Sequence, residues 1–185
     1  MIESDCGHEL LKSDSLPVAR WQTYTVVVLL FVSMSLLAVP TFAASTIFLV
    51  RHAERADSGG SVSSDPGLSA EGSMRALHLA QELKDAKIAA IFTSEYQRTQ
   101  QTAAPLAKSL GIHPEIVPGK DVSSLIARIR ATSGNVLVVG HSNTLPQIVK
   151  ALGISTPVIM TEADYDNLFV VLAGESPRLI WLHYR

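Results

Sequence analysis

Arg51 and His52 directly follow a short apolar run, Ile47 to Val50, and Glu54 comes two residues later. Four apolar residues in a row, three of them β-branched or aromatic, predict a strand buried on both faces. Such a strand delivers a guanidinium and an imidazole to the carboxyl edge of a sheet, where ligands bind in open α/β folds. A strand that simply leaves the core through ordinary polar residues would show the same pattern, so this motif alone does not establish a ligand-binding site.

Two further strand ends bring matching chemistry. A predicted strand at 88–92 leads into a helix with Arg98 in its first turn, and a strand at 136–139 ends at Gly140 and His141. The carboxyl ends of parallel strands share one edge, so these groups can converge. A helix N-terminus favours an anion, and guanidinium groups match phosphate oxygens with paired hydrogen bonds. The set predicts a pocket for a dianionic tetrahedral group.

Each of these residues also has a purely structural interpretation. Arg98 could be a solvated helix residue, and His141 could be a strand-end histidine with satisfied hydrogen bonds. Glu54 is expected to orient Arg51 or His52, or to cap a loop. A metal site built from His52, Glu54 and His141 is disfavoured because the two arginines would repel a divalent cation, so we expect neither metal nor cofactor. The remaining histidines of the domain are interpreted as structural or surface residues: His78, His113 and His183.

The elements that must position these groups alternate along the chain. After a Gly/Ser/Asp/Pro-rich loop at 56–67, Ser69 is expected to cap a helix that runs to about Ala86. Its predicted apolar face consists of Met74, Leu77, Leu79, Ala80 and Leu83. The later elements are a strand at 88–92, a helix at 96–110 closed by Gly111, an edge strand at 113–117, a helix at 122–130, a strand at 136–139, a helix to about 152, and a hairpin of 168–172 with 179–182. This order predicts an α/β fold, a three-layer αβα sandwich with a mostly parallel central sheet.

The first 43 residues have the pattern of a secretory signal peptide. Lys12 and Arg20 precede an uncharged apolar block at 25–40, and small residues lead up to Ala43. We expect cleavage after Ala43, leaving residues 44–185 as the mature domain in the periplasm or outside the cell. The block is shorter than the roughly 20 apolar residues of a bilayer-spanning helix. A retained membrane anchor is the alternative, and the segment before the block is long enough that the true start codon could lie downstream of Met1.

Composition narrows the function of the remaining domain. Of the 185 residues, 15 are basic and 17 acidic, and the part after Ala43 is formally neutral. It has no basic stripe, so nucleic acid is not an expected partner. The single cysteine, Cys6, lies in the leader, which excludes disulfides and cysteine catalysis from the mature domain.

The sequence resembles the histidine phosphatase superfamily, whose fold is called phosphoglycerate-mutase-like. Four motifs carry the resemblance in family order: LVRHAE at 49–54, LSAEG at 68–72, TSEYQRTQQTA at 93–103 and VVGHS at 138–142. It covers nearly all of residues 45–185, and the segments 143–146 and 165–171 are similar to small exported members.

The resemblance implies a role for each motif residue. His52 would be the nucleophile that attacks phosphorus and forms a phosphohistidine, which water then hydrolyses. Arg51, Arg98 and His141 would bind the phosphoryl oxygens and stabilise the charge that develops on them. The two guanidinium groups are also expected to lower the pKa of His52.

The chain departs from the family pattern at the proton donor. Phosphoglycerate mutases and related phosphatases carry a donor Glu in a longer segment after the third strand, which here is only about 118–121. The His-Asp pair of the acid phosphatase branch is also absent after His141. Glu54, Glu115 and Asp121 remain as candidate donors, and the short segment is expected to leave the site open.

We therefore predict an exported phosphatase that hydrolyses phosphomonoesters of a small molecule or a phosphoprotein. A phosphohistidine protein phosphatase fits the short chain, although its known partners are cytoplasmic. A mutase is disfavoured, and a phosphate- or phosphosugar-binding module without catalysis remains the alternative from another class. A membrane would be a partner only if the leader is retained.

Overall fold

The structure, a computed structural model, describes residues 45–56 and 64–184. The predicted leader, its apolar block at 25–40 and the expected cleavage after Ala43 lie outside the described residues. Within the described ranges, no helix is both long enough and apolar enough to cross a membrane.

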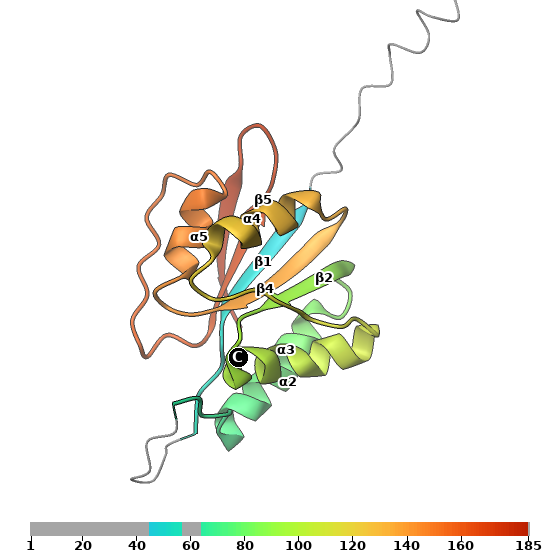
Figure 1. The fold of residues 1–185 in the computed structure, drawn as a ribbon, viewed down its shortest axis with the longest axis vertical. Coiled ribbons are helices and arrows are strands. Elements are labelled where there is room, and N and C mark those ends of the chain that lie inside the picture. The colour runs from blue at the N-terminus through green and yellow to red at the C-terminus, as the bar shows by residue number, and fades with distance from the viewer. Residues whose placement is uncertain (1–44, 57–63, 185) are drawn as a thin grey trace, which may run out of the picture. The chain divides into compact units, whose positions relative to one another are not determined.

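Six strands form one sheet in the order β3-β2-β4-β1-β5-β6 (Figure 1). The strands are β1 (Thr46–Arg51), β2 (Ile88–Thr93), β3 (Glu115–Ile116), β4 (Asn135–Gly140), β5 (Asn167–Leu172) and β6 (Arg178–His183). The first four run parallel, whereas β5 is antiparallel to β1 and β6 to β5. The mostly parallel sheet, the short edge strand β3 and the closing hairpin are therefore confirmed.

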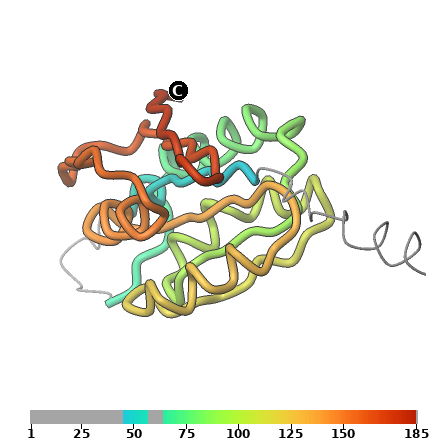
Figure 2. Tube along the Cα trace, turned by 90° about the horizontal axis from the view of Figure 1, so that it is seen from above, coloured from blue at the N-terminus to red at the C-terminus, as the bar shows by residue number. Residues whose placement is uncertain are grey.

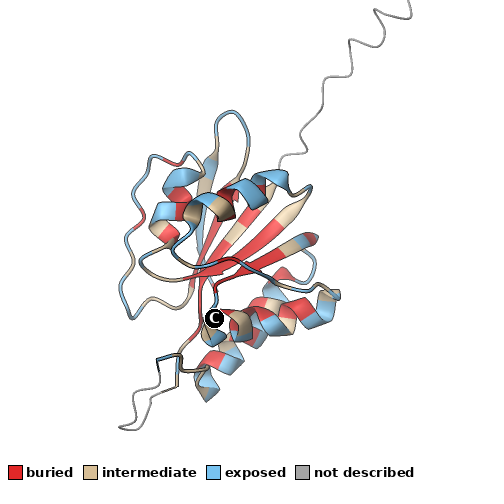
Figure 3. Ribbon diagram, viewed as in Figure 1, coloured by how far each residue is buried: buried red, intermediate tan, exposed pale blue. Residues whose placement is uncertain are grey.

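Helices cover both faces of this sheet. They are α2 (Ala70–Leu83), α3 (Gln97–Leu110), α4 (Val122–Ala131) and α5 (Leu145–Ala151). Alternate residues of β1 point to opposite faces, so Leu49 packs in the core under α4 and α5 and Val50 in the core under α2 and α3. Figure 3 shows buried residues along the strands and on the inner helix faces, with exposed residues outside. The three-layer αβα sandwich is confirmed.

The predicted apolar face of α2 is wrong in part. Met74 and Leu77 are about half exposed, and the buried side of the helix instead consists of Gly72, Ala76, Leu79 and Leu83. Small residues at its start let α2 approach the loop after β1 closely. A Cβ at Gly72 would collide with the carbonyl oxygen of Glu54, so this position has no room for a side chain. Sequence periodicity alone does not reveal such a close contact.

Helix ends follow the expected signals. The hydroxyl of Ser69 accepts a hydrogen bond from Gly72 N at 3.0 Å, and Gly111 ends α3 in the left-handed conformation with φ of 66°. The carboxylate of Asp121 accepts from Ser124 N at 3.0 Å and caps α4. Three of the four helices therefore have a terminus that the sequence specifies locally.

Strand register brings the predicted site residues to one edge. Arg51 is paired with Gly140 across β1 and β4, and the backbone N–H of His52 donates to Gly140 O at 2.9 Å. Thr93 is paired with Val139 across β2 and β4. The chain path through these strands can be followed from a second direction in Figure 2. His52, Ser94 and His141 thus each directly follow a strand at the same edge of the sheet.

Candidate active site

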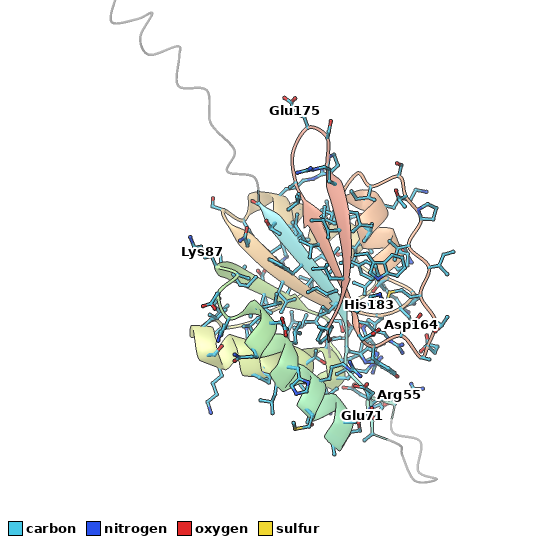
Figure 4. All side chains as sticks on the ribbon, turned by 180° about the vertical axis from the view of Figure 1, so that it is seen from behind. Arg55, Glu71, Lys87, Asp164, Glu175 and His183 are labelled. Atoms are coloured by element: carbon cyan, nitrogen blue, oxygen red, sulfur yellow. The ribbon has the colours of Figure 1, made fainter. Side chains whose placement is uncertain are left out.

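His52 and His141 meet at the carboxyl edge of the sheet. Their ring centroids are 5.2 Å apart, and the ring planes are inclined by 63°. Figure 4 labels Asp164 and Arg55 at this end of the sheet, whereas Lys87, just before β2, lies at the opposite end. The predicted convergence of two histidines that are distant in sequence is therefore present.

The environment of His52 suits a neutral nucleophile. Its Nδ1 lies 2.8 Å from Ala53 O, and because a carbonyl only accepts, Nδ1 carries the proton and Nε2 keeps its lone pair. Burial, helped by repulsion from His141, Arg51 and Arg98, lowers the pKa of His52 to about 4 and outweighs the raising effect of the Ala53 bond. The expected direction is the same, but burial and not the arginines is the largest cause. Only 5% of His52 is exposed.

Ser94 fixes the orientation of His141. The Ser94 hydroxyl lies 2.9 Å from His141 Nε2 and 2.9 Å from Thr99 Oγ1, and the Thr99 hydroxyl donates to Tyr96 O at 2.8 Å. In the tautomer that carries its proton on the other ring nitrogen, Nδ1, the imidazole can donate to an oxyanion. Burial first, and then the positive charge of Arg98, lower the pKa of His141 to about 4.

Arg51 is held from outside by the segment Thr161–Tyr165. Its Nη2 donates to Glu162 Oε2 at 2.8 Å and its Nη1 to Thr161 O at 3.1 Å, while the guanidinium lies 4.1 Å from the ring centroid of Tyr165. Arg51 is only 2% exposed, and its Nε is buried without a hydrogen-bond partner among the described residues. This buried N–H can therefore donate a hydrogen bond to a bound ligand.

Arg98 has a comparable arrangement on the other side. It stacks on Tyr96, 4.3 Å from the ring centroid, and its Nη1 is 3.4 Å from Asp65 Oδ1. Its Nε is also buried and unpaired within the described residues. With a side chain only 14% exposed, Arg98 is not a solvated helix residue.

The N-terminus of α3 differs from the expectation that it helps to bind the phosphate. Its first backbone N–H, from Gln97, donates to the carboxylate of Asp65 at 3.0 Å. A carboxylate supplied by the loop before α2 thus already satisfies the donor that was expected to face an anion.

None of the three expected proton donors extends to the histidine pair as a free carboxylate. Glu54 pairs with Arg75 at 2.6 Å, Glu115 forms an ion pair with Arg128, and Asp121 caps α4. Asp121 and His141 do line the same small cavity of about 20 Å³, which is enough for one water molecule. The other histidines, His78, His113 and His183, are exposed.

Glu162 and Tyr165 are the functional candidates that sequence reasoning missed. The Glu162 carboxylate joins Arg51 to Ser142, whose hydroxyl donates to Oε1 at 2.6 Å, and the Tyr165 ring lies 6.2 Å from that of His52. The signal that could have found them is topological. Because β5 is antiparallel to β1, the residues before β5 enter at the edge where β1 ends. This segment flanks the site beside Arg51, whereas residues 118–121 lie beside His141.

The described residues contain no group of three His, Cys, Asp or Glu side chains placed to hold a metal ion. Glu54 faces Arg75, so it does not join His52 and His141. Independence from metal stays a prediction for solution experiments.

Part of the sequence matches a known protein family. Residues 47–120 match the model of the histidine phosphatase superfamily (branch 1). PE_PGRS11, a PE-PGRS family protein of Mycobacterium tuberculosis, is 49% identical over 55 residues, which are 29% of this chain and 9% of that protein. The chain thus spans less than a tenth of the length of this curated relative.

Solved structures share the fold over most of the described domain. The protein histidine phosphatase SixA, complexed with tungstate, has a TM-score of 0.61 at 22% identity, over 75% of this chain and 96% of its own. A putative α-ribazole-5′-P phosphatase from Escherichia coli has a TM-score of 0.61 at 18% identity, over 76% and 96%. A mycobacterial glucosyl-3-phosphoglycerate phosphatase has a TM-score of 0.58 at 16% identity, over 76% and 98%. At these identities the likeness concerns the fold alone. The family model covers residues 47–120, and over this range the predicted resemblance to the histidine phosphatase superfamily is confirmed.

Proposed function

We propose that this protein is a metal-independent phosphatase that hydrolyses phosphomonoesters through a phosphohistidine on His52. The match of residues 47–120 to the histidine phosphatase superfamily supports phosphatase chemistry in general. The observation that carries the specific proposal is the combination of a buried imidazole protonated on Nδ1 with two buried guanidinium Nε–H groups that lack partners in the described part of the chain. A bound phosphoryl group supplies the acceptors that Arg51 and Arg98 need.

The chemistry follows from these positions. The Nε2 lone pair of His52 attacks phosphorus while the bond to the leaving oxygen breaks. Arg51, Arg98 and the His141 imidazole hold the phosphoryl oxygens, whose charge is stabilised without a metal because the donors are already in place. Water then attacks phosphorus, the P–N bond breaks and its electron pair returns to Nε2.

Two alternatives keep a specific observation in their favour. SixA is described as a protein histidine phosphatase, and this chain covers 96% of it. The nitrogen leaving group of a phosphoramidate departs more easily than an alkoxide because the nitrogen can already be protonated when the substrate binds. A phosphohistidine protein phosphatase therefore needs no carboxylic acid in the site. A phosphate-binding module without turnover would use the same arginines, but it would not need an unoccupied Nε2.

We also propose that the domain acts in the periplasm or outside the cell, as the pattern of residues 1–43 predicts. A retained leader would instead place the same domain at a membrane. The substrate is then a phosphorylated small molecule or protein met outside the cytoplasm, and a phosphohistidine protein of the cytoplasm becomes a less suitable partner.

The experiment is turnover of p-nitrophenyl phosphate by protein purified from cells that express the full chain. We expect activity that persists in EDTA and is lost in His52→Ala. A His78→Ala variant, which changes an exposed histidine, is the matched control and should stay active. No turnover of any phosphomonoester by the folded wild type, or loss of turnover in EDTA with recovery by a divalent ion, would contradict the proposal.

A further inference from the structure

One carboxylate of the described domain connects the two sides of the candidate site. Glu162 accepts from Arg51 Nη2 at 2.8 Å through Oε2 and from the Ser142 hydroxyl at 2.6 Å through Oε1. Its partners follow or end β1 and β4, the strands that present His52 and His141. The Glu162 side chain is nevertheless 78% exposed, so it contacts both the site and solvent.

The other nearby carboxylates are held for structural reasons. Glu95 Oε2 accepts from Gly119 N at 2.7 Å and fixes the loop before α4. Glu54 is bound by Arg75 through both oxygens. Glu162 alone among these three has a side chain of the reactive cluster, Arg51, as its partner, and its charge acts on both His52 and His141.

We propose that Glu162 is the proton-transfer group of the reaction, an inference that rests on the proposed phosphatase function. When His52 attacks phosphorus and the P–O bond breaks, the protonated Glu162 carboxyl gives its proton to the leaving oxygen and an alcohol departs. In the second step the Glu162 carboxylate takes one proton from the attacking water. The P–N bond breaks, its electron pair returns to His52 Nε2, and hydrogen phosphate leaves with Glu162 protonated again.

Substrate binding supplies the proton that this cycle requires. In the empty site the Ser142 bond and the charge of Arg51 lower the pKa of Glu162, so the carboxylate is ionised. A phosphoryl group bound to Arg51 shares that positive charge and adds negative charge beside the carboxylate, which favours protonation. The proton comes from water or from the monoanion of the substrate. Exposure of the side chain makes this exchange accessible.

The test compares Glu162→Gln with the wild type on two substrates in a single turnover. Glutamine has the same shape, and its amide oxygen can still accept from Arg51, but it cannot transfer a proton. We expect release of the alcohol from a simple alkyl phosphate to fall by about 100- to 10,000-fold. Release of p-nitrophenol, which leaves without a proton, should be largely retained, and phosphoenzyme should accumulate because the second step lacks its base.

Controls separate this role from a structural one. Glu95→Gln removes a carboxylate beside His141 without touching Arg51, and we expect any change to be equal for both substrates. In Ser142→Ala the loss of a bond that lowers the pKa of Glu162 should move the basic limb of alkyl phosphate turnover to higher pH, with the aryl phosphate limb unmoved.

Each outcome decides the matter. An equal fall on both substrates in Glu162→Gln, no change on either, or faster turnover of both would overturn the assignment of Glu162 and leave the proposed function intact. Failure of the folded wild type to turn over any phosphomonoester, p-nitrophenyl phosphate included, would overturn the proposed function, and the role of Glu162 with it.

Discussion

The hydroxyl of Ser94 lies 2.9 Å from Nε2 of His141, so the end of β2 orients the histidine that follows β4. We predict that Ser94→Ala lowers kcat/KM because His141 loses the hydrogen bond that holds its ring in place. The loss of one neutral hydrogen bond corresponds to about 2- to 12-fold. Steady-state kinetics with Ser109→Ala as control measures this, since Ser109 donates only to Leu106 O within α3. Equal kinetics in both variants would contradict the role of Ser94.

Arg98 should not tolerate lysine. A single ammonium replaces neither the stacking on Tyr96 nor the buried Nε–H that is offered to phosphate. Loss of one charge-assisted hydrogen bond predicts a fall in kcat/KM of about 10- to 150-fold for Arg98→Lys. Arg128→Lys is the matched control, because Arg128 is half exposed and pairs with Glu115 away from the histidines. Full activity of Arg98→Lys would contradict phosphate binding by the Arg98 guanidinium group.

Stability should fall in mildly acidic solution. The unfolded chain binds protons at His52 and His141 near pH 6.5, whereas burial lowers the pKa of each folded histidine to about 4. Between about pH 6.5 and 4 the unfolded state therefore binds more protons, and the free energy of unfolding decreases as the pH falls. Above about 6.5 the two histidines add no pH dependence.

Thermal unfolding from pH 7.5 to 4 measures this decrease. The double variant His52→Asn, His141→Asn should flatten the decrease in this window, whereas replacing the exposed His78 should leave it unchanged. An identical slope in the wild type and the double variant would show that other groups cause the acid sensitivity.

The leader is predicted to be removed. Mass spectrometry of the protein recovered from the periplasm or medium should find Ala44 or Ser45 as the first residue. An intact residue 1–43 segment in the membrane fraction would instead make the enzyme membrane-anchored.

Much of the site could be predicted because its residues follow continuous apolar strands. Val50 and Val139 are almost completely buried, and the polar residues after them necessarily emerge at one edge of a parallel sheet. The contacts of Arg51 could not be predicted, since they depend on how the irregular segment before β5 folds back. That segment has no periodicity, and Glu162 is 111 residues away from Arg51.

Glu54 illustrates a second limit. It stands in the motif beside His52, yet its partner is Arg75 on α2, 21 residues later. The pair forms because Gly72 lets α2 approach the loop after β1, a contact that no propensity scale records. The sequence therefore identified the groups that are proposed to bind phosphate, while the partner of each carboxylate required the tertiary structure.

The most direct test of the account is to trap the phosphoenzyme. Protein quenched during turnover of a ³²P-labelled phosphate ester should carry a label that is lost in acid and stable in base, and that maps to His52. The label should be absent in His52→Ala and present in His78→Ala. A label that is stable in acid, a label on another residue, or turnover by His52→Ala would contradict the assignment of His52 as nucleophile.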